Sequence, residues 1–167
     1  RVPMRGNVTY TQPVIKGEGK RYAFYTKIAS QLAGLGFNEI LTNSLVHSKY
    51  TELTGLRAEA DVKILNPISA ELDVLRQSLL GSGLQVAASN INRRNKDLKL
   101  FEFGKVYSRN PELQSDKDSP LRPFAEKEML GFWFSGNEQA ESWNIPGKSV
   151  DLYSVKAALE TVFKKAG

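Results

Sequence analysis

The chain has 167 residues, of which 41% are hydrophobic and 25% charged, values typical of one soluble globular domain with a buried core. It has no cysteine and one histidine, His47, which excludes disulfides and thiolate zinc sites and disfavours a histidine-based metal site or triad. No apolar run is long enough for a membrane span. The absence of cysteine fits a reducing cytoplasm, where we expect the protein to be found. The net charge of +5 favours anionic partners, including RNA.

The first 35 residues divide into two parts. Residues 1–17 are polar with prolines and glycines and are predicted to be an N-terminal arm or linker, followed by one domain over 18–167. A helix is predicted from 18 to 35, ended by Gly34 and Gly36. Its apolar stripe should cover a sheet and comprises Tyr25, Ile28, Leu32 and Leu35. A second, mostly small face could meet another helix and comprises Tyr22, Thr26, Ala29 and Ala33.

Strands and a second long helix are predicted next. The strands are expected over 37–46, 62–65 and 73–80, with a short helix over 48–56 that Ser48 caps. His47 is interpreted as a surface or capping residue at the start of this short helix. Ser82 and Gln85 fit a capping box, which starts a helix with an apolar stripe through Leu84, Ala87, Ala88 and Ile91.

Residues 98–107 are the most strand-like segment. Phe101 and Phe103 share one face, and Leu98, Leu100 and Val106 share the other, with Glu102 among them. Two mainly apolar faces indicate a central strand covered on both sides. A long loop over 108–126, a strand over 129–135 and a last helix capped by Asp151 follow. The stripe of that helix is Leu152, Val155, Leu159 and Val162.

The order helix, three strands, helix, two strands, helix favours an α+β fold with a mostly antiparallel sheet flanked by helices. The chain lacks an initial methionine and ends where a helix would just be finishing. We therefore expect a piece of a longer protein.

Few residues point to chemistry, and we predict no catalytic, cofactor-binding or metal-binding residue. Gly81-Ser82-Gly83 matches no phosphate-loop pattern and is interpreted as a strand-to-helix turn that uses the freedom of glycine. Such a helix start could still bind an anion. Glu102 sits in an apolar strand and needs a cationic partner, Arg76 or Lys105, which would make it structural.

A basic cluster, Arg93, Arg94 and Lys96, follows the second helix. Cations there complement a helix C-terminus, which is the first interpretation. The alternative is that these residues contact RNA, with an affinity that falls steeply with salt.

Several motifs together resemble one known family. They are Leu65-Asn66-Pro67-Ile68-Ser69, then Leu75-Arg76-Gln77-Ser78-Leu79-Leu80, then Leu98-Lys99-Leu100-Phe101-Glu102-Phe103-Gly104-Lys105-Val106-Tyr107. The chain resembles the synthetase-like core of the bacterial phenylalanyl-tRNA synthetase β chain. The resemblance implies a class II aminoacyl-tRNA synthetase-like fold. It also implies a noncatalytic module that packs against the catalytic α chain in an α2β2 enzyme, which charges tRNA with phenylalanine using ATP and magnesium.

The resemblance also implies roles for single residues. The first class II signature serves dimer packing, so Tyr22, Thr26, Ala29 and Ala33 become candidate interface residues. Arginine at Ala29 or Ala33 is then expected to abolish capture of the α chain without unfolding the domain.

A degenerate nucleotide cleft is implied at Glu102, Lys105 and Arg109. Glu112 lies three residues after Arg109, instead of the two of the second signature, and the last helix offers no counterpart of the third-signature arginine. Two other functions remain as alternatives to a packing module. One is tRNA contact through Arg93, Arg94 and Lys96. The other is an independent adenylating or biotin-ligase-like enzyme, which the missing arginines disfavour.

Overall fold

The computed structural model describes residues 18–67, 69–115 and 117–166, so the predicted arm over 1–17 lies outside the described residues. The helices are α1 (Glu18–Gly34), α2 (Lys49–Leu53), the 3-10 helix η1 (Ala58–Ala60), α3 (Leu80–Asn92) and α4 (Leu152–Ala166). The strands are β1 (Asn38–Glu39), β2 (Leu45–Val46), β3 (Val62–Lys63), β4 (Val74–Leu75), β5 (Leu98–Arg109), β6 (Phe124–Ser135), β7 (Asn137–Gln139) and β8 (Lys148–Ser149).

The main sheet has the order β1-β5-β6. β1 is parallel to β5, whereas β5 and β6 form a long antiparallel pair that runs from Leu98 opposite Ser135 to Arg109 opposite Phe124. A small sheet β2-β4-β3 and the hairpin β7–β8 are antiparallel as well. The predicted α+β fold with a mostly antiparallel sheet is confirmed.

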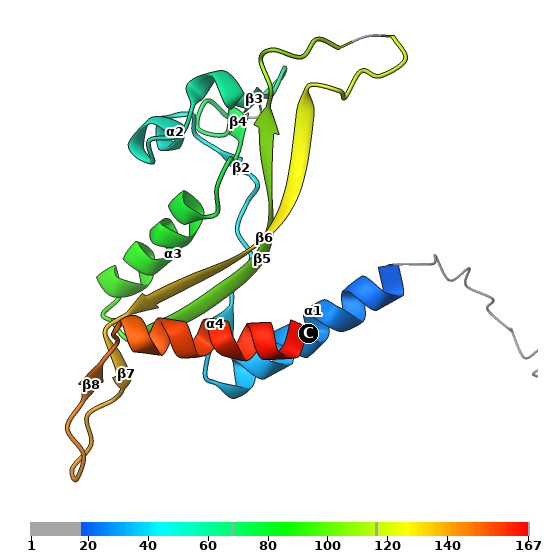
Figure 1. The fold of residues 1–167 in the computed structure, drawn as a ribbon. Coiled ribbons are helices and arrows are strands. Elements are labelled where there is room, and N and C mark those ends of the chain that lie inside the picture. Colours follow the sequence, from blue (N-terminus) through cyan, green and yellow to red (C-terminus); the bar gives the residue numbers. More distant parts are fainter. Residues whose placement is uncertain (1–17, 68, 116, 167) are drawn as a thin grey trace, which may run out of the picture.

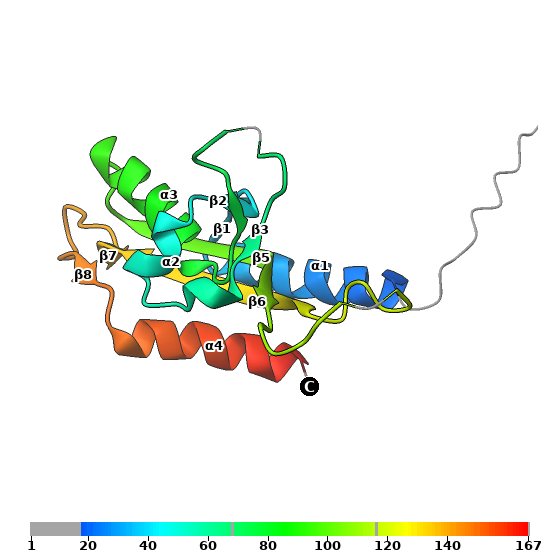
Figure 2. The same cartoon turned by 90° about the horizontal axis from the view of Figure 1, so that it is seen from above.

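Helices cover both faces of β5 and β6. Figure 2 shows α3 and α4 on opposite sides of the two strands. α1 packs on the side of α4, since its Ile28 and Leu32 share a core cluster with Ala158 of α4. One core cluster lies under α1 and α4 and consists of Ile28, Leu32, Phe37, Phe101 and Ala158. The other lies under α3 and consists of Leu79, Leu98, Leu100 and Trp133. β5 therefore is the central strand with two apolar faces that the sequence predicts.

Two helices end at a glycine in the left-handed conformation. After α1, Gly36 has φ 84°, and the amide of Phe37 donates to the carbonyl of Leu32 at 3.1 Å. The helix ends at the predicted glycines, and the side chains of Leu32 and Phe37 are both buried in one core cluster beside this end. Gly55, with φ 67°, ends α2 in the same way.

The strands differ from their predicted lengths. Of the strand expected over 37–46 only β1 and β2 form, and of the strand expected over 73–80 only β4. Conversely, β6 begins at Phe124, five residues before the predicted start. Residues 124–129 are exposed and carry no apolar pattern, so only their pairing with β5 makes them a strand.

The helix starts are partly as predicted. Asp151 caps the N-terminus of α4, accepting a hydrogen bond from the amide of Ser154 at 2.8 Å. The capping box of α3 is wrong, because the helix already begins at Leu80, and the buried Ser82 hydroxyl has no hydrogen-bond partner. Instead the amide of Leu80 donates to the Ser78 hydroxyl.

At α2 the Ser48 side chain makes no capping bond. His47 takes this role, since its Nδ1 accepts from the amide of Lys49 at 3.1 Å. The interpretation of His47 as a capping residue is confirmed.

The buried stripe of α4 is also displaced. Ala158 is 3% exposed and Val162 packs against the core, but Leu152 is 79% exposed and Leu159 is 37% exposed. The helix therefore turns a neighbouring face toward α1 and the sheet and leaves a second apolar stripe in solvent.

Candidate functional site

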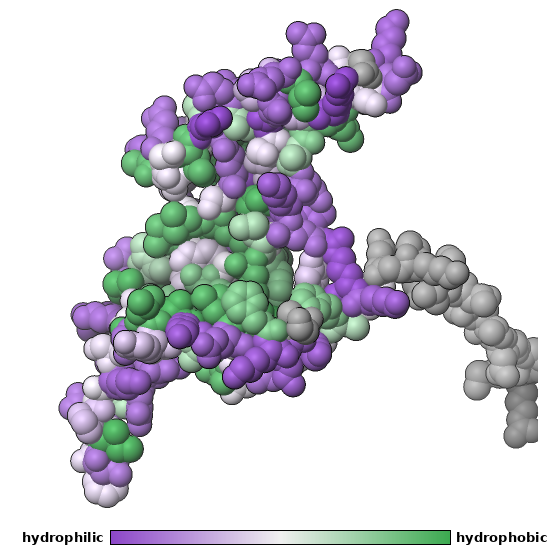
Figure 3. Space-filling view, in the orientation of Figure 1, coloured by the Kyte–Doolittle hydropathy of each residue, from purple (hydrophilic) through white to green (hydrophobic). Residues whose placement is uncertain are grey.

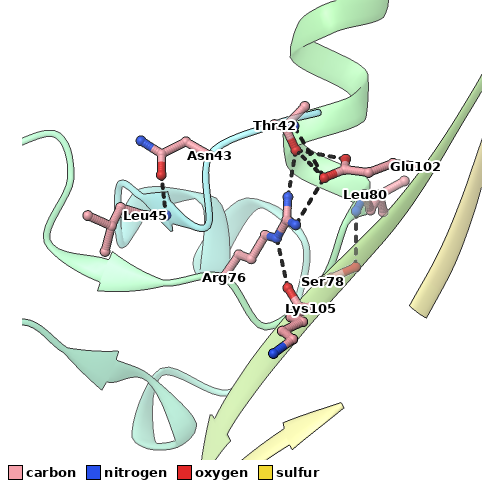
Figure 4. A network of polar contacts seen from close by, with 8 residues as sticks. All are labelled: Thr42, Asn43, Leu45, Arg76, Ser78, Leu80, Glu102 and Lys105. Atoms are coloured by element: carbon pink, nitrogen blue, oxygen red, sulfur yellow. Dashed lines mark hydrogen bonds and ion pairs between the residues drawn. The ribbon is translucent and has the colours of Figure 1, made fainter. Parts of the chain in front are cut away.

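A buried ion pair lies on the sheet face under α3 (Figure 4). The Glu102 side chain, on β5, is 0% exposed, and its Oε1 lies 3.0 Å from Nη2 of Arg76, which is 3% exposed. Thr42 joins the pair: its hydroxyl lies 2.7 Å from Glu102 Oε2 and accepts from Arg76 Nη1 at 2.5 Å. Arg76 Nε donates to the Lys105 carbonyl at 2.9 Å.

This network satisfies charges that would otherwise be costly to bury. It joins three segments that are distant in the sequence: the link after β1 through Thr42, the segment after β4 through Arg76, and β5 through Glu102. The structural interpretation of Glu102 is confirmed, with Arg76 as its partner.

Trp133 fills the same face of the sheet. Its indole lies so close to α3 and β6 that a Cβ on Gly83 would be 1.9 Å from Trp133 Cε2, and one on Gly131 2.5 Å from Trp133 Cη2. Gly104 likewise leaves no room for a side chain, since a Cβ there would lie 2.5 Å from Arg76 Nη2. The protein's own side chains thus occupy this surface.

The segment Gly81-Ser82-Gly83 is glycine-rich for a reason that the sequence analysis missed. Neither glycine has a positive φ, so conformational freedom is not the cause. Gly83 admits the Trp133 ring, and Gly81 lies against the ring of Tyr50, 3.5 Å from Cδ1 to the position of a Cβ. An aromatic side chain therefore packs at each glycine of the predicted turn.

The expected interface residues lie on the outer side of α1, with one exception. Tyr22 is 74% exposed, and Thr26 and Ala33 are exposed as well. Ala29 instead packs partly buried against the core cluster that contains Ile28 and Leu32. Because Ala29 faces the core, an arginine at this position would disturb folding. The expectation that Ala29→Arg leaves the domain folded is therefore wrong.

The N-terminal half of α1 is anchored on β5 and β6. The ring of Tyr25 stacks on Phe103 with centroids 4.8 Å apart, and its hydroxyl donates to Glu128. Arg21 forms an ion pair with Glu128. These contacts hold the outer face of the helix in a fixed orientation.

Comparisons with known proteins agree with this architecture. Residues 7–167 match the family described as the phenylalanyl tRNA synthetase beta chain CLM domain. The chain belongs to this family. A phenylalanine–tRNA ligase beta subunit from Bacteroides fragilis is 41% identical over 141 residues, 84% of this chain and 17% of that protein. One from Thermotoga maritima is 32% identical over 92% of this chain and 18% of that protein. The chain thus spans less than a fifth of these relatives.

Solved structures show the same fold at low sequence identity. An ATP phosphoribosyltransferase regulatory subunit/histidyl-tRNA synthetase from Bacillus halodurans has a TM-score of 0.64 at 18% identity, covering all of this chain and 39% of that one. A pyrrolysyl-tRNA synthetase from Desulfitobacterium hafniense has a TM-score of 0.57 at 16% identity, covering 88% of this chain and 46% of that one. The fold of this synthetase β-chain module is therefore class II synthetase-like, as predicted.

The residues expected to form a degenerate nucleotide cleft in the β-chain module are not brought together. Glu102 is sealed in the buried network, while the Lys105 side chain is 45% exposed and pairs with Glu126 at 2.7 Å. That hydrogen bond and the charge of Glu126 raise the pKa of Lys105. Since side chains three apart on a strand point to opposite faces, Glu102 and Lys105 cannot share a cleft. Arg109 is exposed at the far end of β5.

A hollow lies elsewhere, between α2 and α3. It has a volume of about 820 Å³, enough for a small ligand, and the residues that line it include Tyr50, Leu72 and Gln85. Lys49 and His47 are its basic residues, and no arginine lines it.

The cluster of Arg93, Arg94 and Lys96 lies exposed just beyond the end of α3. Arg93 is the C-cap, and Arg94 has a positive φ of 68°.

In the described part of the chain we find no group of three or more metal-ligating side chains. None of its helices is both long and apolar enough to cross a membrane.

Proposed function

We propose that this chain is the noncatalytic synthetase-like module of a phenylalanine–tRNA ligase β subunit. In the full enzyme it packs against the catalytic α chain and helps to build an α2β2 assembly in the cytoplasm. That assembly charges tRNA with phenylalanine and uses ATP and magnesium, which the α chain handles. The observation that carries the proposal is the class II fold whose sheet face is occupied by its own residues, Arg76, Glu102 and Trp133.

The filled sheet face argues against adenylate chemistry. Adenylate formation needs cations fixed on the phosphates to stabilise the charge that develops in the transition state. The Arg76 guanidinium is already used by Glu102, Thr42 and the Lys105 carbonyl. Arg109 lies exposed at the end of β5, away from this pair. We therefore expect no binding of magnesium–ATP to the isolated β chain at millimolar concentration, and calorimetry that measured micromolar binding would contradict the silent site.

Exposed apolar helix faces support a packing role. α1 presents Tyr22, and α4 presents Leu152, Leu159 and Phe163 at spacings of seven and four residues, which places them on one stripe. Figure 3 shows apolar surface gathered between α3 and α4 on the face of Figure 1. Obligate interfaces are large and apolar, and such faces supply that surface.

Co-purification with the α chain tests the proposal. In the full-length β chain, Thr26→Arg and Ala33→Arg place a bulky charge on the exposed face of α1, and each is expected to abolish capture of the α chain. Ala58→Arg is the matched control, because Ala58 is exposed in η1, between the charged residues Arg57 and Glu59 and outside the apolar helix faces. Capture that survives both α1 substitutions would show that this helix face is not the interface.

A further inference from the structure

The hairpin β7–β8 carries an exposed tryptophan at its tip. Trp143 is 96% exposed, and Ile145 beside it is 41% exposed. The hairpin is braced by strand pairing, by the Ser142–Ile145 bridge, and by an ion pair between Lys148 and Glu138 at 3.1 Å. A large aromatic ring held in solvent on a braced hairpin is a typical anchor for a partner.

The base of the hairpin is joined to the loop after α3. The amide of Asn137 donates to Asp97 Oδ1 at 2.7 Å. Gly136 has φ 73°, and a Cβ there would lie 2.2 Å from Asp97 Oδ1 and 2.5 Å from the Lys96 carbonyl. The hairpin and the loop that contains Arg93, Arg94 and Lys96, here called the basic loop, therefore form one unit at one end of the molecule (Figure 1).

The backbone of the basic loop holds an arginine where glycine would be more stable. The amide of Asn95 donates to the Asn90 carbonyl at 3.0 Å, the arrangement that also ends α1 and α2. Those helices use Gly36 and Gly55 at the left-handed position, whereas α3 uses Arg94. Strain of this kind is retained where a side chain has a use.

The cations of the basic loop outnumber the carboxylate beside them. Asp97 accepts from the amide of Asn137 and keeps its negative charge, so three cations stand against one carboxylate in this loop. Glu138 accepts from the Ser154 hydroxyl and from Lys148, which lower its pKa, and Lys148 balances its charge. No ion pair within the described residues engages the three exposed cations of the basic loop. They are available to an anionic partner.

We propose that the basic loop and Trp143 together bind RNA. The cations hold backbone phosphates, and the Trp143 ring stacks on an unpaired base. Trp143 lies six positions after Asn137, so at most about 20 Å separates them at 3.3 Å per residue, a distance that a short single-stranded segment spans. This surface lies apart from the outer face of α1. The RNA-binding proposal can therefore be right or wrong independently of the packing against the α chain proposed above.

The test measures binding of a phenylalanine tRNA transcript to the full-length β chain purified with its α chain, over a series of salt concentrations. Trp143→Ala should weaken binding roughly tenfold, and Trp143→Phe should restore most of the loss, because stacking needs only an aromatic face. Arg93→Gln with Lys96→Gln should lower the slope of log affinity against log salt by about 1.5. The matched control, Lys49→Gln with Lys63→Gln, removes two exposed lysines far from the basic loop and should leave the slope unchanged.

A blunt-ended RNA duplex is the second probe. It should bind the wild-type and Trp143→Ala proteins equally, since it offers no unpaired base along its length. Unchanged tRNA affinity in Trp143→Ala, or an unchanged salt slope in the double variant, would overturn the proposal. Loss of the α chain in Trp143→Ala with unchanged tRNA affinity would also overturn it, because the tip would then be a protein contact.

Discussion

Replacing Glu102 by alanine removes one partner of the buried ion pair and leaves Arg76, only 3% exposed, as an unpaired charge. Breaking a buried pair in this way costs about 3–5 kcal/mol, because the remaining charge keeps its desolvation penalty. For a domain of this size each kcal/mol lowers the melting temperature by roughly 2–4 °C, so we expect a decrease of roughly 10 °C. Thermal and urea unfolding, followed by circular dichroism, measure it.

Two further variants test whether the loss of stability in Glu102→Ala comes from the unpaired charge of Arg76. Arg76→Met with Glu102→Met removes both charges and should recover most of the lost stability, leaving a residual cost from the unpaired Thr42 hydroxyl. Glu126→Ala breaks the Lys105–Glu126 pair, whose side chains are 45% and 49% exposed, and should leave the melting temperature nearly unchanged. A Glu102→Ala protein as stable as Glu126→Ala would refute the central role of the network.

Three other predictions follow from close contacts and caps. Gly83→Ala should destabilise the chain by about 1–3 kcal/mol, because the new Cβ meets Trp133 at 1.9 Å, whereas Gly81→Ala, with 3.5 Å to Tyr50, should be neutral or slightly stabilising in urea unfolding. Arg94→Gly should raise the free energy of unfolding by about 0.5–1 kcal/mol, since glycine tolerates the φ of 68°; a decrease would contradict this account of the α3 end. Hydrogen bonds from Ser154 lower the pKa of Asp151 below its ordinary value, so the stability that Asp151 contributes is present at neutral pH and is lost as pH falls through the folded-state pKa. Asp151→Ala should therefore be less stable than the wild type at pH 7, with a difference that narrows below pH 4.

Some features were fixed by local sequence. The glycine after α1 and the Asp151 cap depend on neighbouring residues alone, and both are present. Of the predicted α1 stripe, Ile28 and Leu32 are buried, whereas Leu35 lies past the end of the helix and is 41% exposed. The alternation in 98–107 also placed Phe101 and Phe103 opposite Leu98 and Leu100. A strand with two apolar faces has only one place in a layered fold, at its centre.

The partner of Glu102 required the tertiary structure. The sequence shows that a buried carboxylate needs a cation and leaves Arg76 and Lys105 as choices. The pleat of β5 turns Lys105 to the other face, and the chain brings Arg76 across from a segment 26 residues earlier in the sequence. The length of β6, the Trp133 ring over Gly83 and the inward turn of Ala29 likewise depend on which surfaces meet. Periodicity tells which face of an element is apolar, but only the packed neighbours decide how far that face is covered.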